Sequence, residues 1–256
     1  MPNLDIHLFA CLKDNYGVLI RDAEQDVTAS IDAPDAAAVT KALDDKGWRL
    51  THIFTTHHHN DHTGGNLALK EQTGCTIVGP RAEASRIPGL DRAVGEGDEV
   101  PFGQFPVQVL ETPGHTLGHI SYHIPRAGVA FVGDTLFTLG CGRVFEGSYE
   151  MMWSSLKKLM RLPAKTMIYS GHEYTLANAK FAISVDPDNV ALQRRVAEID
   201  ELRAKGAPTV PTQLSAELDT NPFLRAHAAG IRERLKLGGA ADWKVFAELR
   251  ERKNKA

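Results

Sequence analysis

The sequence has few cysteines, and they are widely spaced. Its three cysteines, Cys11, Cys75 and Cys141, form no CxxC motif, and their odd number argues against a disulfide framework or a thiolate metal site. A reducing compartment suits such a chain best. The N-terminal stretch lacks the basic region and long apolar run of a secretory signal, and no apolar run approaches membrane-spanning length. We therefore expect a cytoplasmic protein with no membrane partner.

A strong excess of charge of one sign is also lacking. The 29 Lys and Arg residues against 32 Asp and Glu residues give a formal net charge of -3. No overall basic field would draw the chain towards nucleic acid or anionic lipid, so we expect no nucleic-acid partner. Any anionic ligand must instead meet a local basic patch.

The hydrophobic pattern changes along the chain and predicts two domains. With 256 residues and 43% hydrophobic content, the chain can bury a large core. The first two thirds alternate short apolar or β-branched runs with Gly-rich turns, whereas the last third is typical of helices separated by Pro and Gly. We expect one domain over residues 1–173 and a smaller, helical domain over residues 174–256.

Strands outnumber helices in the first of these domains. The runs predicted to be strands are 5–9, 16–22, 30–32, 50–55, 76–79, 107–112, 118–124, 129–133 and 166–170. This pattern lacks the regular strand–helix alternation of a barrel or a doubly wound sheet. Two sheets packed face to face, with helices outside, suit it better.

Four amphipathic helices are predicted. The first spans 34–46, with Pro34 in its first turn and Gly47 at its end. The second begins near Ser148, and the last two span 188–205 and 242–253. Their apolar stripes consist of Met152, Leu156, Leu159 and Met160, then Leu192, Val196 and Ile199, and finally Val245, Phe246 and Leu249.

A histidine-rich segment follows the predicted strand 50–55. Within six residues it contains His57, His59, Asp61 and His62. Side chains two apart in an extended chain point the same way, so His57 and His59 can converge on one ion. Asp61 and His62 fall where the chain turns into a helix. Their side chains can converge on a second position close to the ion shared by His57 and His59.

Three more candidate ligands, His115, Asp134 and His172, each follow a strand-like run. One ion with an open coordination position takes three or four protein ligands, so five histidines and two aspartates fit two ions better than one. Asp134 can bridge the ions through its two oxygens. Imidazole and carboxylate ligands without thiolate suit two divalent ions, which are zinc by default, with iron or manganese as alternatives.

For the remaining histidines the sequence gives less reason to expect a role in the metal site. His58 is expected to support the loop, and His119 either supports a ligand or has a structural role. The other four, for which surface or core roles are favoured, are His7, His52, His123 and His227. Cys141 is interpreted as a small loop residue rather than a nucleophile.

With these motifs the sequence resembles the metallo-β-lactamase superfamily, whose HxHxDH motif is present at 57–62. Within it the chain resembles the glyoxalase II (hydroxyacylglutathione hydrolase) family over essentially its whole length. The segments that narrow the resemblance are GCGR at 140–143, GHEYT at 171–175, NPFLR at 221–225 and RERK at 250–253.

The resemblance implies an α/β fold: a four-layer αβ/βα sandwich of two mixed β-sheets flanked by helices, followed by a smaller all-helical domain. It assigns His57, His59 and His115 to the first ion and Asp61, His62 and His172 to the second, with Asp134 on both. Residues 1–173 would be the catalytic domain and 174–256 the substrate-binding domain. The residues implied to hold glutathione are Arg143, Phe145, Tyr174, Arg250 and Lys253. Phe145 stands where the family often has tyrosine, so a hydroxyl contact is missing there.

The activity implied is hydrolysis of S-(2-hydroxyacyl)glutathione thioesters, typically S-D-lactoylglutathione to D-lactate and glutathione, the second step of methylglyoxal detoxification. Water between two cations loses a proton near neutral pH, so a metal-bridging hydroxide would attack the thioester carbonyl. The thiolate leaves readily, because a thiol pKa is about 8.5. Asp61 and Asp134 are the expected catalytic side chains, and the chain is expected to act as a monomer.

Several alternatives stay open at this point. A lactone hydrolase, a persulfide dioxygenase with one iron and an RNA-processing nuclease share the scaffold. The helical tail with its NPFLR segment argues against the first two, and the lack of a basic surplus argues against the third. A non-catalytic metal-binding or interaction protein is disfavoured because all seven ligands are retained.

Overall fold

The computed structural model describes residues 3–256 and divides into two compact units. Unit 1 comprises the chain up to Glu111 together with Leu117–Gly133, and unit 2 comprises Thr112–Thr116 and Asp134–Ala256. The short segment Thr112–Thr116 therefore groups with a part of the chain that follows it. These units are defined by compactness, whereas the division expected at Tyr174 separates a catalytic from a substrate-binding domain and stays a prediction.

Unit 1 begins with a mixed, six-stranded sheet. Its strands, in order across the sheet, are β1 (Asp5–Cys11), β2 (Asn15–Asp22), β3 (Val27–Ile31), β4 (His52–Phe54), β5 (Thr76–Pro80) and β6 (Arg92–Val94). The pairs from β1 to β3 are antiparallel and those from β3 to β6 are parallel. Parallel neighbours need crossovers. The first two contain α1 (Ala36–Lys46) and α3 (Asn66–Thr73), and the third, from β5 to β6, contains the 3-10 helix η1 (Arg81–Arg86).

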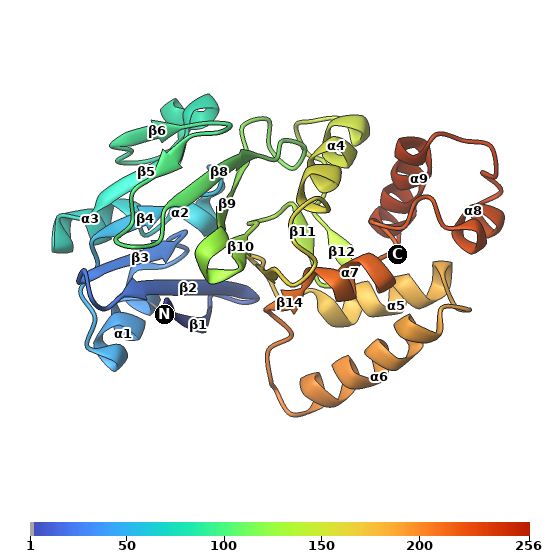
Figure 1. Cartoon of the computed structure of the whole chain (residues 1–256), viewed down its shortest axis with the longest axis horizontal. Coiled ribbons are helices and arrows are strands. Elements are labelled where there is room, and N and C mark those ends of the chain that lie inside the picture. The colour runs from blue at the N-terminus through green and yellow to red at the C-terminus, as the bar shows by residue number, and fades with distance from the viewer. Residues whose placement is uncertain (1–2) are drawn as a thin grey trace. The chain divides into compact units, whose positions relative to one another are not determined.

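Helices α1 and α3 cover one face of the first sheet (Figure 1). Val39 and Leu43 of α1 and Leu69 of α3 are buried in one cluster with Ile53 and Ile77 of the sheet. The cluster fixes β4 and β5 firmly. Their carboxyl ends consequently become a rigid support for the loops that follow.

A second set of strands faces the first sheet within unit 1. It consists of the antiparallel neighbours β7 (Glu99–Val100), β8 (Val107–Glu111), β9 (Ile120–Ile124) and β10 (Val129–Phe131). The rings of Phe54 on β4 and Tyr122 on β9 lie 5.4 Å apart, and Phe102 contacts Phe54 at 5.5 Å. The expected packing of two sheets face to face is therefore confirmed.

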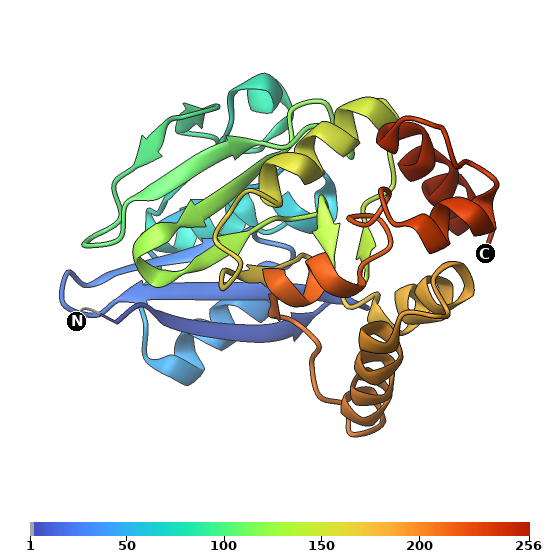
Figure 2. The ribbon, with the colours of Figure 1, turned by 45° about the vertical axis from the view of Figure 1, so that its right-hand side comes forward.

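Unit 2 is mainly helical. Its helices are α4 (Tyr149–Leu159), α5 (Thr175–Val185), α6 (Val190–Ala204), α7 (Leu214–Thr220), α8 (Ala229–Leu235) and α9 (Asp242–Asn254). It also contains two short antiparallel strand pairs, β11 (Leu136–Phe137) with β12 (Gly140–Cys141), and β13 (Met167–Tyr169) with β14 (Thr212–Gln213). Helices α5 and α6 are neighbours (Figures 1 and 2) and pack around a core that includes Ala182, Leu192 and Ile199. The expectation of two sheets flanked by helices, followed by a helical C-terminal region, is confirmed.

Every predicted strand and helix has a counterpart, but some boundaries differ. Pro34 precedes α1 instead of opening it, because the side chain of Asp35 caps the helix by accepting a hydrogen bond from the Ala38 N–H. Met160 is only half-buried, because α4 ends at Leu159. Val196 is likewise half-buried, so the buried stripe of α6 reduces to Leu192 and Ile199.

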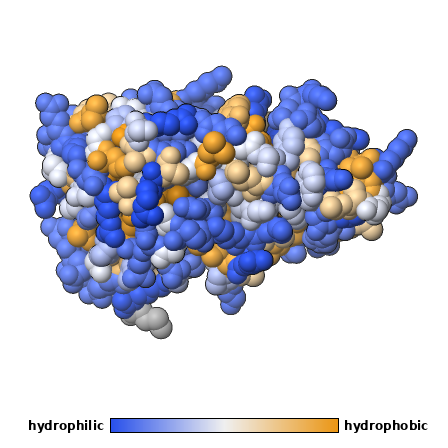
Figure 3. All heavy atoms as spheres, turned by 90° about the horizontal axis from the view of Figure 1, so that it is seen from above, coloured by the Kyte–Doolittle hydropathy of each residue, from blue (hydrophilic) through white to orange (hydrophobic). Residues whose placement is uncertain are grey.

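The surface is mostly hydrophilic on the face seen in Figure 3, where hydrophobic atoms occur in scattered groups. Over residues 3–256, no helix has the length and apolar character needed to cross a bilayer.

Candidate metal centre

The histidine-rich segment links strand β4 to the short helix α2 (Asn60–Thr63). His57 and His59 lie in the extended part, and Nε2 of His57 is 3.1 Å from Nδ1 of His59. Two ligands about 2 Å from one tetrahedral ion lie about 3.3 Å apart, so this separation suits a shared cation. Asp61 and His62 belong to α2, as predicted, and the His62 ring lies 4.2 Å from that of His57.

Asp32, which the sequence analysis missed, fixes the orientation of His62. This buried aspartate directly follows β3, and its Oδ2 lies 2.8 Å from Nδ1 of His62. It also accepts hydrogen bonds from the backbone N–H of Thr56 (2.7 Å) and from its hydroxyl (2.9 Å). The same hydroxyl lies 3.0 Å from Nδ1 of His57. A histidine whose Nδ1 is held by an oxygen presents Nε2 to a metal, so Asp32 and Thr56 prepare both rings for ligation.

Two further side chains of unit 1 contact the candidate ligands. The Asn15 side-chain amide donates to the carbonyl of Asp61 at 3.1 Å and to its carboxylate at 3.3 Å. His119, for which a supporting and a structural role were open, stacks on His57 with ring centres 4.8 Å apart. An asparagine at the start of β2 carries no sequence signal for this contact, which depends on the fold alone.

His58 contacts Glu83 through both its backbone and its ring. The backbone N–H of His58 donates to Oε2 of Glu83 at 2.8 Å, and Nδ1 of His58 lies 2.7 Å from the same oxygen. The other oxygen of Glu83 accepts from the N–H of Gly118 at 2.9 Å. Glu83 thereby joins the loop before α2 to the loop before β9, and His58 supports the loop as expected.

Within unit 2, Asp134 lies between two histidines. Its Oδ2 is 3.4 Å from Nε2 of His115 and 3.4 Å from Nε2 of His172. His115 is oriented by the backbone carbonyl of Arg143, which lies 2.8 Å from its Nδ1. Gly142 is required here, because a Cβ at this position would lie 1.9 Å from the carbonyl oxygen of Asp134.

Aromatic rings flank the histidines of unit 2. Tyr174 stacks on His172 with ring centres 4.8 Å apart and planes at 5°, and Phe137 contacts both rings. Phe145 lies 5.2 Å from His115 and is 62% exposed. Such rings restrict the histidine rotamers and leave an apolar surface beside the ligands.

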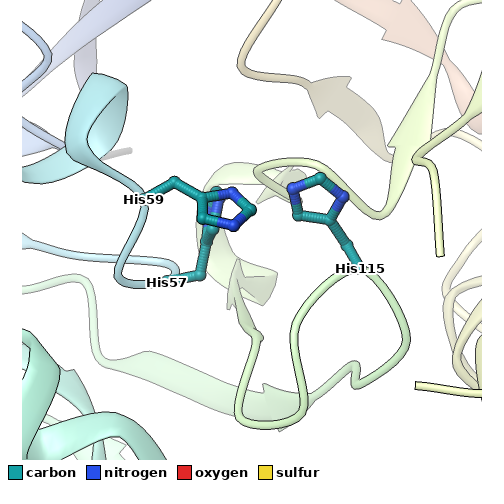
Figure 4. Close-up of side chains that lie close together, drawn as sticks. All are labelled: His57, His59 and His115. Carbon is teal, nitrogen blue, oxygen red and sulfur yellow. The ribbon is translucent and has the colours of Figure 1, made fainter. Parts of the chain in front are cut away.

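The predicted ligands occur in three groups whose donor atoms lie within 4.8 Å of one another. The groups are His57, His59 and His115; Asp61, His62 and His172; and His57, His62 and Asp134. Figure 4 shows the first group, with three imidazole rings gathered from two loops. Imidazole and carboxylate donors are the chemistry that a divalent transition metal prefers. In His57, His62 and His115 an oxygen beside Nδ1 leaves Nε2 for the metal.

Two cations on α9 lie near Cys141 and α5. Arg250 is buried, donates to the carbonyl of Cys141 at 2.8 Å and stacks over Phe223. Lys253 donates to the carbonyl of Ala177 at 2.8 Å. Burial lowers the pKa of Lys253, and the positive charges of Arg250 and Arg143 lower it further. The positive charge gathered around Lys253 favours an anionic ligand there.

Cys141 itself is unsuited to nucleophilic chemistry. Burial raises the pKa of its thiol to about 11, although the nearby Arg250 opposes the shift. The thiolate is the reactive form of cysteine, so this thiol is inert at neutral pH. The three cysteines are all buried free thiols.

Comparisons with known proteins agree with this geometry. Residues 26–172 match the sequence model described as the metallo-beta-lactamase superfamily, and residues 173–256 match the one described as hydroxyacylglutathione hydrolase C-terminus. The chain is 56% identical to the hydroxyacylglutathione hydrolase of Rhizobium meliloti, over 99% of both chains. It is also 56% identical to that of Brucella anthropi, over 99% of this chain and 97% of the relative.

Among solved structures, the chain resembles the crystal structure of ETHE1 from Myxococcus xanthus. The TM-score is 0.70 and the sequence identity 28%, with 98% of this chain and 91% of that chain covered. A B3 metallo-beta-lactamase, BLEG-1, matches with a TM-score of 0.66 at 21% identity, over 86% of this chain and 99% of that chain. The second likeness shows the fold alone.

Proposed function

The chain belongs to the hydroxyacylglutathione hydrolase family of the metallo-beta-lactamase superfamily, and from this premise we propose how its residues perform the family's reaction. It is a metal-dependent hydrolase of S-(2-hydroxyacyl)glutathione thioesters, which releases the hydroxy acid and glutathione. The observation that carries the assignment is the 56% identity with curated relatives over nearly the whole chain. S-D-lactoylglutathione is the substrate we expect.

The proposed metal centre takes seven side chains. His57, His59 and His115 would hold one ion, Asp61, His62 and His172 a second, and Asp134 both. The grouping of donor atoms supports this division, and the equal 3.4 Å distances from Asp134 to two histidines support its bridging role. We propose zinc, because imidazole and carboxylate donors without thiolate suit it, although they suit iron and manganese as well.

When bound, such ions lower the pKa of coordinated water and polarise a carbonyl oxygen. Other groups of the protein orient the proposed ligands and hold them in place. Asp32 and Thr56 fix the tautomers of His57 and His62, the Arg143 carbonyl fixes that of His115, and Asn15 holds the carboxylate of Asp61. A thiolate leaving group needs little protonation, so no side chain is required as a strong general acid.

We propose that residues 174–256 form the substrate-binding domain. Glutathione has two carboxylates, and the positive charges of Arg250 and Arg143 that act on Lys253 support an anion site beside helix α9, to which Arg143 would contribute from outside this domain. Tyr174 and Phe145 would contact the tripeptide beside the histidines on which they pack. Phe145 offers a ring but no hydroxyl, so its contribution is limited to apolar contact.

We also propose a cytoplasmic monomer that binds neither nucleic acid nor membranes. Free thiols at all three cysteines, which lie in the described part of the chain, support a reducing compartment. The balance of charge supports the absence of a nucleic-acid partner. Light scattering of the purified chain tests the monomer directly.

One assay tests substrate and cofactor together. Hydrolysis of S-D-lactoylglutathione is measured beside that of a lactone and a phosphodiester, with bound metal determined on the same sample. We expect the thioester alone to be turned over efficiently, in proportion to metal content. Preferred turnover of the lactone or the phosphodiester would contradict the proposed substrate, and equal thioester hydrolysis after metal removal would contradict the proposed chemistry.

A further inference from the structure

The β11–β12 hairpin links the three predicted ligands of unit 2. Asp134 stands two residues before β11, and the Gly142 N–H, just after β12, donates to the Thr135 carbonyl at 3.2 Å. The next residue, Arg143, supplies the carbonyl that orients His115. Phe137 of β11 contacts the ring of His172 at 6.0 Å. A displacement of this hairpin would therefore disturb every ligand of the set.

The turn of the hairpin is not stable by itself. It contains Leu139, which has a φ of 56°, in the left-handed region that side chains other than glycine rarely adopt. Each strand has only two residues, so few ladder hydrogen bonds oppose the strain. The turn needs support from outside the hairpin.

Glu217 of α7 provides part of that support. It is a fully buried carboxyl group, with 0% of the residue exposed, and its two oxygens face different ways. Oε2 accepts hydrogen bonds from the Leu139 N–H and from the Asn221 amide, both at 2.9 Å. Oε1 accepts from the Thr212 hydroxyl at 2.8 Å and pairs with Arg195. A buried carboxyl group is tolerated only when it is paired and hydrogen-bonded, and here both oxygens are.

Two asparagines hold the carbonyl groups of the same turn. The Asn221 amide donates to the carbonyls of Phe137 (3.2 Å) and Gly140 (2.9 Å). The Asn178 amide, from α5, donates to the carbonyl of Thr138 at 3.1 Å. Asn221 opens the NPFLR segment, to which neither the metal ligands nor the proposed substrate contacts assign a role.

We propose that Asn221 and Glu217 are positioning residues of the metal centre: through the β11–β12 hairpin they hold Asp134, His115 and His172 in the geometry that binds metal. This inference rests on the proposed function, because it needs those three side chains to be ligands. It differs from a general contribution to folding, because only the contacts on the hairpin side of Glu217 should affect metal binding.

Two substitutions on opposite sides of Glu217 test the proposal. Asn221→Ala removes the donors to the hairpin carbonyls, whereas Thr212→Val removes a donor to Oε1, away from the hairpin. Zinc affinity is measured by competition with a chelator, and the melting temperature by calorimetry. Both variants should have a lower melting temperature than the wild type. We expect zinc affinity to fall about 10- to 100-fold in Asn221→Ala and to change less than about threefold in Thr212→Val.

The kinetic constants provide a second readout. Asn221→Ala should lower kcat at limiting metal with little change in KM, because the substrate contacts stay in place. Wild-type zinc affinity in folded Asn221→Ala, or an equal loss in Thr212→Val, would overturn the proposal. If Asn221→Ala does not fold, Asn221→Ser replaces it, because a serine can still accept from the Phe223 N–H but has no amide to donate to the hairpin carbonyls. Wild-type zinc affinity in Asn221→Ser would then overturn the proposal.

The wild-type measurement separates this inference from the proposed function. A wild-type chain that binds no metal overturns the proposed function and this inference with it. A wild-type chain that binds metal and hydrolyses the thioester, beside an Asn221→Ala variant of unchanged affinity, overturns the inference alone.

Discussion

Asp134 is the single residue on which the proposed centre depends most. One carboxylate oxygen lies 3.4 Å from two histidines, so it is the side chain placed to serve two ions. Asp134→Asn keeps the size and removes the charge. We expect at least one ion to be lost and kcat to fall by about 100-fold or more, since metal ligation and charge neutralisation fail together. Elemental analysis measures the bound metal, and steady-state kinetics on the same preparation measure kcat.

A matched control for this substitution is Asp26→Asn. Asp26 is exposed and forms a surface ion pair with Arg21. Surface pairs contribute about 0–1 kcal/mol, so metal content and kcat should equal those of the wild type. Full activity of Asp134→Asn with two bound ions would refute the bridging role.

The proposed contact between Lys253 and glutathione predicts that glutathione binding depends on pH. Its pKa is lowered from the ordinary lysine value by burial first and by Arg250 and Arg143 next. It therefore loses its charge at a lower pH than an exposed lysine. An anionic ligand favours the charged form, so binding takes up a proton and weakens as the pH rises through the lowered pKa.

Lys253→Arg tests this dependence, because arginine stays charged over the whole range. The dissociation constant of glutathione is measured by calorimetry from pH 7 to about pH 10 for both proteins, and their ratio cancels the ionisation of the ligand. Towards alkaline pH, glutathione binding should weaken more steeply in the wild type than in Lys253→Arg. Parallel curves would remove Lys253 from the binding site.

At the scale of elements, the turn that follows strand β10 leaves little room for a side chain. Gly133 has a φ of 45°, and a Cβ there would lie 2.6 Å from the Thr56 hydroxyl and 2.7 Å from Nε2 of His119. Thr56 is the residue that contacts both Asp32 and His57. The turn after β10 can take this conformation beside Thr56 and His119 only if residue 133 is glycine.

Gly133→Ala should therefore lower both stability and metal affinity, and Gly128→Ala is its control. Gly128 also has a positive φ, 67°, but a Cβ there would meet nothing within 4 Å. The control should cost about 1 kcal/mol of unfolding free energy from backbone strain alone. Gly133→Ala should cost about 1–3 kcal/mol more, from overpacking. Denaturant unfolding and zinc competition measure both effects, and equal behaviour of the two variants would contradict the role given to Gly133.

The short strands show what element-scale patterns could not predict. Strands β7, β11, β12 and β14 have only two residues each, too few for an alternating pattern to be recognised. Their positions depend on tertiary contacts, such as the hydrogen bonds from Asn221 that hold the β11–β12 hairpin. Helix α4 was predictable, because Ser148 caps it and its buried residues recur at helical spacing.

At the scale of the whole molecule, the candidate ligands were predictable and their supports were not. His57, His59 and His62 share one local motif, and strand ends are where a sheet collects functional groups. Asp32 is far from that motif in the sequence, and only the parallel pairing of β3 with β4 brings it beside His62. Glu83 and Glu217 reach their loops through similar tertiary contacts. Sequence patterns identify donors, whereas the fold determines which oxygen holds each ring.

We propose that this chain hydrolyses its thioester with two metal ions per molecule. The most direct measurement is the number of ions bound per chain in fully active protein, obtained by elemental analysis while metal is added back to the metal-free form. We predict that thioester hydrolysis reaches its maximum at two ions per chain and disappears when both are removed. Full activity in a chain that binds no metal, or a maximum at a single ion, would contradict the account.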